Sequence, residues 1–525
     1  MLPAQHWAYS FSIGADDIES ITNLLLEKES PLSSVELATE IIKAREDHRR
    51  RKLAQKYLDA KVYRPSETYE LGDRLTFSQL NYATAKVVKL RDGKSTDLRP
   101  LRVAAVEFES SNGKPESRLR EFVIAYDQDH PLNDADSNRH PSQLKGDYTV
   151  DDILNDPDTD IVEQVDDALE RNADLVRLAG TWFVRELMLE VDIGHLHLAE
   201  AVLDMHEGGP LRPEDILDQI GGLGSAPRPL QIFSLNYFMN QDDRFDEVGP
   251  AGKVLWHLTE KLPRLVREVP AILEYEPIAF DRAKLSREMK QLEYDLDDEH
   301  SPVTSPRPEE EVSLTLIYPH RRVGTLPINS ETKYVFPAAK TPRIAITMID
   351  ALDKKEYPCW VVHEFKYVVG LAPIFQKHHL PVGAYVYLTP TEDRSRIEIE
   401  FDTYRPRTEW IPVVERSDRD LLRCKTAKRA IGADYDEMII FGVTNLPEVD
   451  QLGKDLLAKG ASLAQLLVHL VRELSKENPQ GTVHAKILYS TLNILRRCPP
   501  GPMFATLANA PEVEDVGGNY WKLSE

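Results

Sequence analysis

Apolar residues change their spacing several times along the chain. Near the N-terminus they recur at helical spacing over residues 18–25 and 35–42, which predicts two amphipathic helices separated by a turn. Ser34 is placed to cap the second of these helices. From residue 62 the apolar positions alternate between turn residues, which is typical of a small antiparallel barrel. A longer β-rich block begins near residue 312 and predicts a second β domain.

Two distant segments share a second pattern. QIFSLNYFM, around Leu235, and ILYSTLNIL, around Leu492, each contain a Leu-Asn pair, and each is followed by an acidic residue, Val, Gly and then Trp-x-Leu. We interpret each segment as a helix and a β-hairpin, with the hairpin tryptophan, Trp256 or Trp521, folded back onto the helix. Further helical runs precede both segments. Helices that lead into a two-stranded wing predict a winged helix.

Acidic stretches separate these blocks. The stretch over residues 291–311 is also rich in Pro and Ser, which predicts a linker. The expected fold class is therefore α+β with several domains: repeated winged-helix modules, a small SH3-like barrel and a larger β-barrel or sandwich. In chain order we expect an N-terminal winged-helix-like helical module (1–61), the SH3-like barrel (62–127), an acidic linker with a helix (128–190), a second winged helix (191–290), the acidic Pro/Ser linker (291–311), a β-rich barrel domain (312–445) and a C-terminal winged helix (446–525).

The composition supports folded modules and gives the chain a strong negative charge. Hydrophobic residues make up 42% and charged residues 29%, which is ordinary for globular protein. The first residues lack the pattern of a secretion signal, no apolar run is long enough to span a bilayer, and the three cysteines are far apart. We therefore expect a cytoplasmic protein without a metal, cofactor or small-molecule substrate. Because the formal net charge is −23, any DNA contact must come from a local basic patch. The alternative interpretation of the same charge is that the partner is a basic protein.

Two helical stretches provide such patches. In the first, over residues 45–56, the cations are Arg45, Arg49, Arg50, Arg51, Lys52 and Lys56. In the second, over residues 483–497, the polar stripe opposite the apolar one consists of Lys486, Ser490, Asn493 and Arg497. Arg and Lys contact phosphates or guanine and Asn can pair with adenine, so both stretches are candidate DNA-contacting surfaces. The alternative interpretation is a solvated helix face in each case, the first one paired with the acidic linkers.

The quoted segments resemble a known family. SLNYFMNQDDRFDEVGPAGKVLWHL, and LYSTLNILRR with the tail VEDVGGNYWKL, are similar to HARE-HTH winged-helix modules, found in the delta subunit of bacterial RNA polymerase, in restriction systems and in chromatin proteins. The whole chain resembles a type of large bacterial multi-module protein of Chloroflexota-like genomes. The resemblance implies a non-enzymatic transcription or chromatin factor that bridges DNA or RNA polymerase to other proteins.

One group of three residues supports an enzymatic function as the alternative. Asp350 ends the predicted strand RIAITMID, and Glu364 and Lys366 follow in WVVHEFKYVV. Two carboxylates and a lysine on adjacent strands are the groups with which a PD-(D/E)xK nuclease holds Mg²⁺ and orients water. In the other interpretation Asp350 begins a turn, while Glu364 and Lys366 form an ion pair on an exposed sheet.

Overall fold

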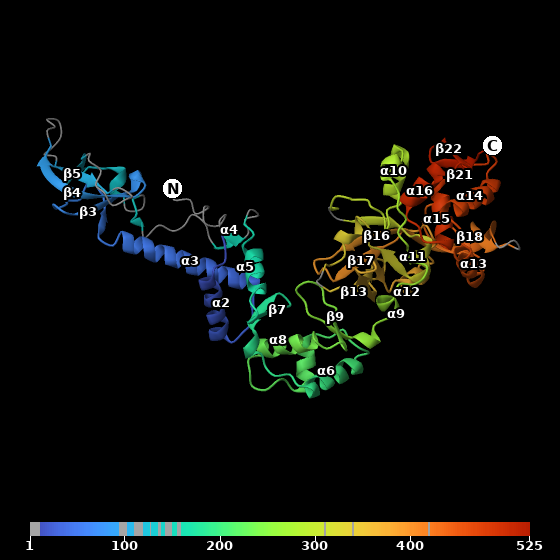
Figure 1. Cartoon of the computed structure of the whole chain (residues 1–525), viewed down its shortest axis with the longest axis horizontal. Coiled ribbons are helices and arrows are strands. Elements are labelled where there is room, and N and C mark those ends of the chain that lie inside the picture. The colour runs from blue at the N-terminus through green and yellow to red at the C-terminus, as the bar shows by residue number, and fades with distance from the viewer. Residues whose placement is uncertain are drawn as a thin grey trace. The chain divides into compact units, whose positions relative to one another are not determined.

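The chain folds into several sheets and helices that form two compact units. The computed structural model describes residues 11–93, 102–109, 119–126, 128–134, 138–141, 150–154, 159–308, 311–338, 341–417 and 421–524 (Figure 1). The units comprise residues 1–190 with 225–233, and residues 191–224 with 234–525, and each is described by itself. The expected mixed α+β, multi-domain character is confirmed. Every helix in the described part of the chain is too short or too polar to span a bilayer.

The first unit combines helices with a β-hairpin. Its elements are α2 (Ala15–Lys28), β1 (Leu32–Ser33), α3 (Ser34–Lys56), α4 (Val150–Leu154), α5 (Ile161–Glu170), β7 (Leu175–Leu178) and β8 (Thr181–Val184), and the strands pair in the order β1-β8-β7. The two N-terminal helices appear where the apolar spacing predicts them. Ser33 rather than Ser34 caps α3, because the Ser33 Oγ accepts a hydrogen bond from the Glu36 amide at 3.2 Å, and the Glu36 carboxylate accepts one from the Ser33 amide.

A five-stranded sheet is inserted between α3 and α4. Its strands are β2 (Ala60–Val62), β3 (Arg74–Phe77), β4 (Ala83–Asp92), β5 (Arg102–Phe108) and β6 (Arg120–Ile124), paired in chain order. Only β2 and β3 run parallel; the other neighbours are antiparallel. Alternate residues of a strand point to the same face, so Leu75 and Phe77 of β3 both enter the core of this sheet.

The second unit begins with three helices and a short hairpin. These are α6 (Ile193–Met205), α7 (Pro213–Ile220), α8 (Arg228–Met239), β9 (Phe245–Glu247) and β10 (Trp256–Leu258); the first residues of α8 belong to the first unit. Leu211, between α6 and α7, forms an isolated bridge to Trp256 of β10. The Trp256 indole donates a hydrogen bond to the Asn236 side chain of α8 at 2.7 Å, which closes this small core.

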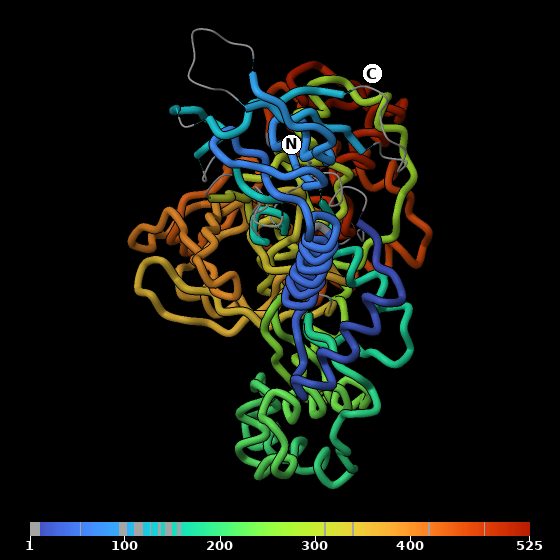
Figure 2. Tube along the Cα trace, turned by 90° about the vertical axis from the view of Figure 1, so that its left-hand side faces the viewer, coloured from blue at the N-terminus to red at the C-terminus, as the bar shows by residue number. Residues whose placement is uncertain are grey.

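A seven-stranded sheet, curled into a half-barrel, forms the middle of the second unit (Figure 2). Its order is β11 (Val312–Thr315), β16 (Tyr385–Pro390), β17 (Arg396–Glu400), β13 (Arg343–Asp350), β14 (Glu356–Val362), β15 (Tyr367–Val369) and β12 (Thr325–Pro327). The pair β13–β17 is parallel and the other pairs are antiparallel. The short helices α11 (Tyr318–Val323) and α12 (Ala372–Lys377) pack against each other. A separate sheet follows, in the order β19 (Leu422–Ala433), β18 (Thr403–Arg416), β20 (Gly442–Val443).

The C-terminal part returns to helices and a hairpin. Its elements are α13 (Leu446–Ala458), α14 (Leu463–Leu474), β21 (Val483–His484), α15 (Ala485–Leu495), α16 (Pro500–Asn509), β22 (Val513–Gly517) and β23 (Tyr520–Leu523). The strands pair in the order β21-β23-β22. The same order, with the first strand against the last, occurs in the first unit for β1, β8 and β7.

Three tryptophans occupy matching places in these hairpins. Trp182, Trp256 and Trp521 lie in the last strand of each hairpin, and all three are 1–2% exposed. Each is opposite a residue that lies between two helices: Leu32, Leu211 or Val483. The sequence pattern identified only the second and third tryptophans.

The Leu-Asn pairs that suggested the repeat are not equivalent. Leu235 lies in α8, which directly precedes its hairpin, whereas Leu492 lies in α15, and α16 follows before the hairpin begins. The prediction that these two helices are equivalent in the repeat is therefore wrong.

The stretches predicted to be linkers also contain structured elements. The acidic stretch 128–190 contains α5 and the β7–β8 hairpin, although residues 135–137, 142–149 and 155–158 lie outside the described part. The stretch 291–311 begins inside α10 (Arg287–Asp295), and its Asp298 and Glu299 are buried. It therefore packs into the second unit instead of forming a solvated linker, because its carboxylates meet a buried arginine.

Candidate nucleic-acid interface

The basic half of α3 begins at a residue with a structural role. The Arg45 guanidinium forms an ion pair with Asp17 at 2.7 Å, donates to the Ser12 carbonyl at 2.6 Å and lies 4.4 Å from the centre of the Phe11 ring. These contacts tie α3 to the start of α2. Arg45 is therefore committed to the fold of the first unit.

The next two cations have weak partners on their own helix. Arg49 lies 3.6 Å from Glu46, and Arg50 lies 3.9 Å from Asp47, both at i,i+3 spacing. Such solvated pairs contribute about 0–1 kcal/mol and hold the side chains loosely. Both cations can therefore exchange these partners for a phosphate.

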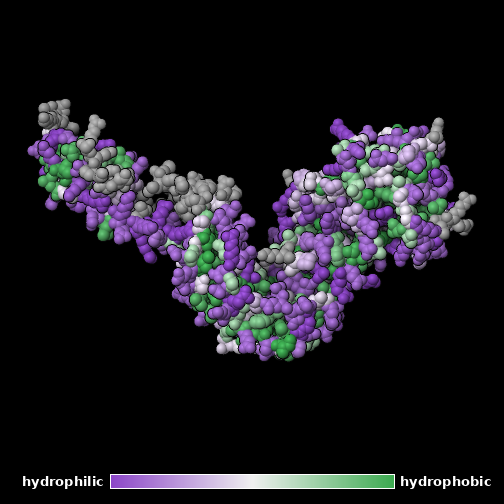
Figure 3. Space-filling view, in the orientation of Figure 1, coloured by the Kyte–Doolittle hydropathy of each residue, from purple (hydrophilic) through white to green (hydrophobic). Residues whose placement is uncertain are grey.

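The end of this basic stretch is exposed and is fixed to the sheet. Arg51 and Lys52 are exposed and have no ion pair among the residues that the structure describes. The Lys56 ammonium lies 5.4 Å from the centre of the Tyr57 ring, and the Lys56 carbonyl accepts a hydrogen bond from Arg74 of β3 at 3.3 Å. Figure 3 shows hydrophilic residues along this helix. The result is a cationic helix face with one end anchored on the five-stranded sheet.

The second predicted patch, which consists of three residues of α15 and of Arg497 just after it, faces the protein interior. Ser490, Asn493 and Arg497 are 1%, 1% and 4% exposed. Lys486 is half-buried, and its ammonium contacts the Asp436 carboxylate at 2.7 Å. This corrects the prediction of a groove-reading stripe, because a buried face cannot enter a DNA groove. Its polar residues satisfy partners within the second unit.

Arg497 is the centre of a buried ionic network. Its guanidinium contacts the Asp298 carboxylate at 2.7 Å and the Glu299 carboxylate at 2.9 Å. Tyr489 donates to Asp298 at 2.8 Å, and the His320 ring lies 3.1 Å from Glu299. Burial alone would lower the pKa of Arg497, but the two carboxylates outweigh it and hold that pKa well above its usual value. The network joins α15 to the segment after α10 and to α11.

The residues of the nuclease alternative lie at opposite ends of a hairpin. Asp350 is the last residue of β13, whereas Glu364 and Lys366 lie in the turn after β14, beside Arg343 at the start of β13. Seven residues of extended strand separate these ends by about 23 Å. The structure therefore does not bring the three residues together. Among the described residues, no cluster of His, Cys, Asp and Glu side chains suits a metal ion.

Asp350 has local partners instead. Its buried carboxylate contacts the Lys377 ammonium at 2.7 Å and the His378 ring at 2.6 Å, at the end of α12. Lys377 also contacts Asp353 at 2.7 Å. Burial would raise the pKa of Asp350, but the hydrogen bonds from Lys377 and His378 outweigh it and lower that pKa. This cluster holds α12 against the turn after β13.

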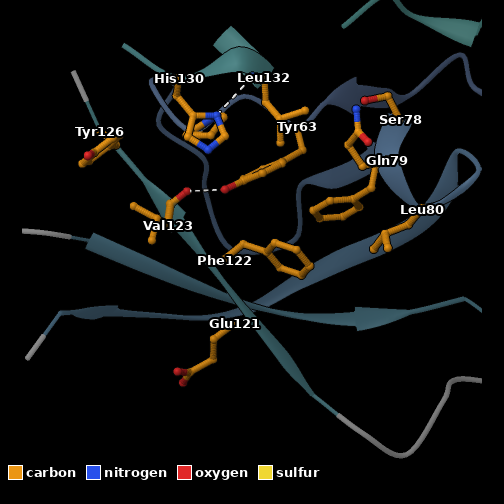
Figure 4. Close-up of a pocket in the computed structure, with 12 residues that line it drawn as sticks. Tyr63, Ser78, Gln79, Leu80, Glu121, Phe122, Val123, Tyr126, His130 and Leu132 are labelled. Carbon is orange, nitrogen blue, oxygen red and sulfur yellow. Dashed lines mark hydrogen bonds between the residues drawn. The ribbon is translucent and has the colours of Figure 1, made fainter. Parts of the chain in front are cut away.

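The five-stranded sheet carries a pocket that the sequence analysis missed (Figure 4). Its volume is about 540 Å³, and its wall includes Tyr63, Phe77, Phe122 and Leu80. The Phe77 and Phe122 rings are 4.4 Å apart, and Tyr63 stacks on Phe77 at 4.9 Å. Glu121 belongs to the rim, but Figure 4 shows its side chain directed away from the rings. The walls therefore suit an apolar side chain. A partial signal in the sequence is that Phe77 and Phe122 each lie two residues from another apolar strand residue, Leu75 and Ile124.

The Tyr63 hydroxyl is fixed by strand β6. It donates to the Val123 carbonyl at 2.6 Å, and burial raises its pKa to about 12. His130 lies at the rim, where its Nδ1 accepts a hydrogen bond from the Leu132 amide at 3.1 Å. These contacts hold the pocket in a defined shape without placing a charge in it.

Comparisons of the chain with known protein families, with characterised proteins and with solved structures gave no match.

Proposed function

We propose that the chain contains three winged-helix modules. Three segments support this, because each runs helix, short strand or bridge residue, helix, helix and hairpin, with the first strand position against the last strand. Each has a buried tryptophan at the same place in the hairpin. The segments begin at α2, α6 and α14. In the first module the five-stranded sheet is an insertion between the second and third helices, and we propose that it is SH3-like.

The third helices of the first and last modules, α5 and α16, favour protein packing over groove reading. In helix-turn-helix proteins this helix enters the major groove, where cations contact bases and phosphates. Here α5, IVEQVDDALE, has four carboxylates and no cation, and α16, PGPMFATLAN, has neither. In addition, α16 is covered by α10, which lies beside it in Figure 1. In these two modules the third helix is therefore suited to packing against protein, and not to entering a DNA groove.

The function that we propose is a non-enzymatic, DNA-associated transcription or chromatin factor. It contacts duplex DNA through phosphates, along the basic half of α3. The observation that carries this proposal is the exposure of Arg50, Arg51 and Lys52 on a helix that is anchored at its far end. Phosphate contacts give affinity without sequence preference. The similarity to HARE-HTH modules, which implies a bridge between DNA or RNA polymerase and other proteins, agrees with this role.

A salt series tests the DNA contact. The affinity of the full chain for a mixed-sequence 30-bp duplex is measured by fluorescence anisotropy between 50 and 300 mM KCl. Each phosphate contact contributes about 0.9 to the slope of log K against log salt. Removing three cations in Arg50→Ala, Arg51→Ala, Lys52→Ala should therefore flatten the slope by about 3.

The matched control removes three exposed cations elsewhere: Arg267→Ala, Lys284→Ala, Arg287→Ala. It changes the net charge equally and should leave the slope unchanged. The proposal fails if both triple variants flatten the slope alike, or if neither does.

The aromatic pocket supports a second role, which is docking on RNA polymerase. An apolar pocket with fixed walls can receive one anchoring side chain of a partner, and such anchors dominate many interfaces. Leu80→Asp places a charge at the pocket wall and should weaken binding to purified RNA polymerase at least tenfold. Leu71→Asp, at an exposed residue outside the pocket wall, should not. Equal binding by both variants and the wild type would exclude this docking site.

A further inference from the structure

A long β-ribbon in the second unit carries an exposed tryptophan. Strands β18 and β19 pair along most of their length, and Trp410 is directly opposite Lys428 (β18 is labelled in Figure 1). The Trp410 side chain is 67% exposed, whereas three other tryptophans of the chain are 1–2% exposed. The Lys428 ammonium lies 5.1 Å from the centre of the Trp410 ring. One face of the ribbon therefore presents a flat indole with a cation beside it.

The ribbon is cationic although the chain has a net charge of −23. Strand β19, LRCKTAKRAIGA, has four cations and no carboxylate. Lys425 has an ion pair with Glu415, but no ion pair involves Arg423, Lys428 or Arg429 within the described ranges. Strand β19 is also an edge strand, with only β18 beside it in its sheet. The cations can therefore reach solvent around this edge.

Edge protection explains the cations only in part. Charged residues on an edge strand prevent pairing with other chains, and lysines are common there. That role needs no exposed indole, and a large exposed aromatic side chain would oppose it. Lys428 is on the same face of the ribbon as Trp410, whereas Arg423 and Arg429 alternate onto the other face of the same edge strand. An edge that has an exposed aromatic ring on one face and cations on both faces is suited to a flexible polyanion that has planar groups and can follow the edge.

We propose that this ribbon binds single-stranded nucleic acid. Trp410 stacks on one base, and the cations of β19 contact the neighbouring phosphates. A single strand fits better than a duplex, because the bases of a duplex are already stacked on each other and leave no free face for the indole. An acidic protein would use the same cations but would gain little from Trp410. The site is separate from α3, and it does not depend on the role proposed for that helix.

The test measures binding of the full chain to a fluorescein-labelled 20-nucleotide oligo(dT) by anisotropy. Base stacking on an aromatic ring contributes about 1–3 kcal/mol, so Trp410→Ala should weaken binding at least about fivefold, while Trp410→Phe should retain most of it. Leu352→Ala, which removes a 71% exposed apolar side chain from a turn of the same unit, should have no effect. Arg423→Ala with Arg429→Ala should flatten the salt slope by about 1.4.

Two results would overturn the proposal. In the first, Trp410→Ala binds oligo(dT) as tightly as the wild type. In the second, poly-glutamate displaces oligo(dT) equally well from the wild type and from Trp410→Ala, which would identify the ribbon as a site for an acidic protein. The α3 triple variant separates this site from the other one: it should lose duplex binding and still show the full Trp410 effect on oligo(dT).

Discussion

The two helices with predicted DNA-binding stripes, α3 and α15, have opposite environments. On α3 the cations beyond Arg45 are solvated, and the carboxylates near them, Glu46 and Asp47, lie one turn away on the same helix. On α15 the stripe is buried, and Arg497 meets Asp298 and Glu299, which are about 200 residues away in the sequence. Similar stripes therefore serve different purposes. Whether a polar stripe faces solvent or the core depends on where the carboxylates that pair with its cations lie, and not on the cations themselves.

The largest expected effect comes from removing the buried cation. Arg497→Met leaves Asp298 and Glu299 buried without their partner, which should lower the free energy of unfolding of the second unit by about 3–5 kcal/mol. Arg51→Met, on the solvated helix, should change the stability of the first unit by less than about 0.5 kcal/mol. Urea unfolding followed by far-UV circular dichroism measures both. Comparable losses in the two variants would remove the distinction between the helices.

A pH series sharpens the same contrast. Burial raises the pKa of Glu299, but Arg497 and His320 outweigh it and hold that pKa well below its usual value. The stabilisation is therefore complete above the unfolded pKa of about 4.3 and is lost as the pH falls through the lower, folded value. Glu299→Gln should cost about 2 kcal/mol of unfolding free energy at pH 7 and at pH 5, and less near pH 3. A difference that already disappears between pH 7 and pH 5 would contradict this account of the network.

The smallest expected effect concerns the acidic residues of α3. Glu46→Gln with Asp47→Asn removes the carboxylates nearest to Arg49 and Arg50, and solvated pairs are worth about 0.2–1 kcal/mol. Stability should change by less than about 0.5 kcal/mol, while affinity for duplex DNA should rise about two- to fivefold because phosphates lose a competitor. Thermal unfolding and anisotropy measure the two quantities. Weaker DNA binding in this variant would argue against phosphate contact by α3.

Periodicity predicted local structure well and long-range partners poorly. The spacing of apolar residues located α2, α3 and most strands, because it depends only on which face of each element is buried. The repeat was found through Trp256 and Trp521, but Trp182 was missed because a five-stranded sheet separates its hairpin from α3. The third copy could have been found from the Trp in the short strand TWFV.

The candidate sites depended on information that spacing does not contain. A polar stripe on a helix has the same sequence pattern whether it meets water or, like Arg497, a distant carboxylate. Asp350 and Glu364 were close in sequence, but the β13–β14 hairpin places them at opposite ends because the chain reverses between them. The shape of the aromatic pocket required the fold, since its walls come from two strands, β3 and β6, and from segments outside the strands that are distant in the sequence.

Lysine footprinting tests the central comparison most directly. Lys52 and Lys56 are exposed on α3, whereas Lys486 on α15 is paired with Asp436. Acetylation of the full chain, read by mass spectrometry with and without a 30-bp duplex, should modify Lys52 and Lys56 rapidly in the free protein and slowly in the complex. Lys486 should react slowly in both. Protection of Lys486 by DNA, with unchanged reactivity at Lys52 and Lys56, would contradict the assignment of the DNA contact to α3.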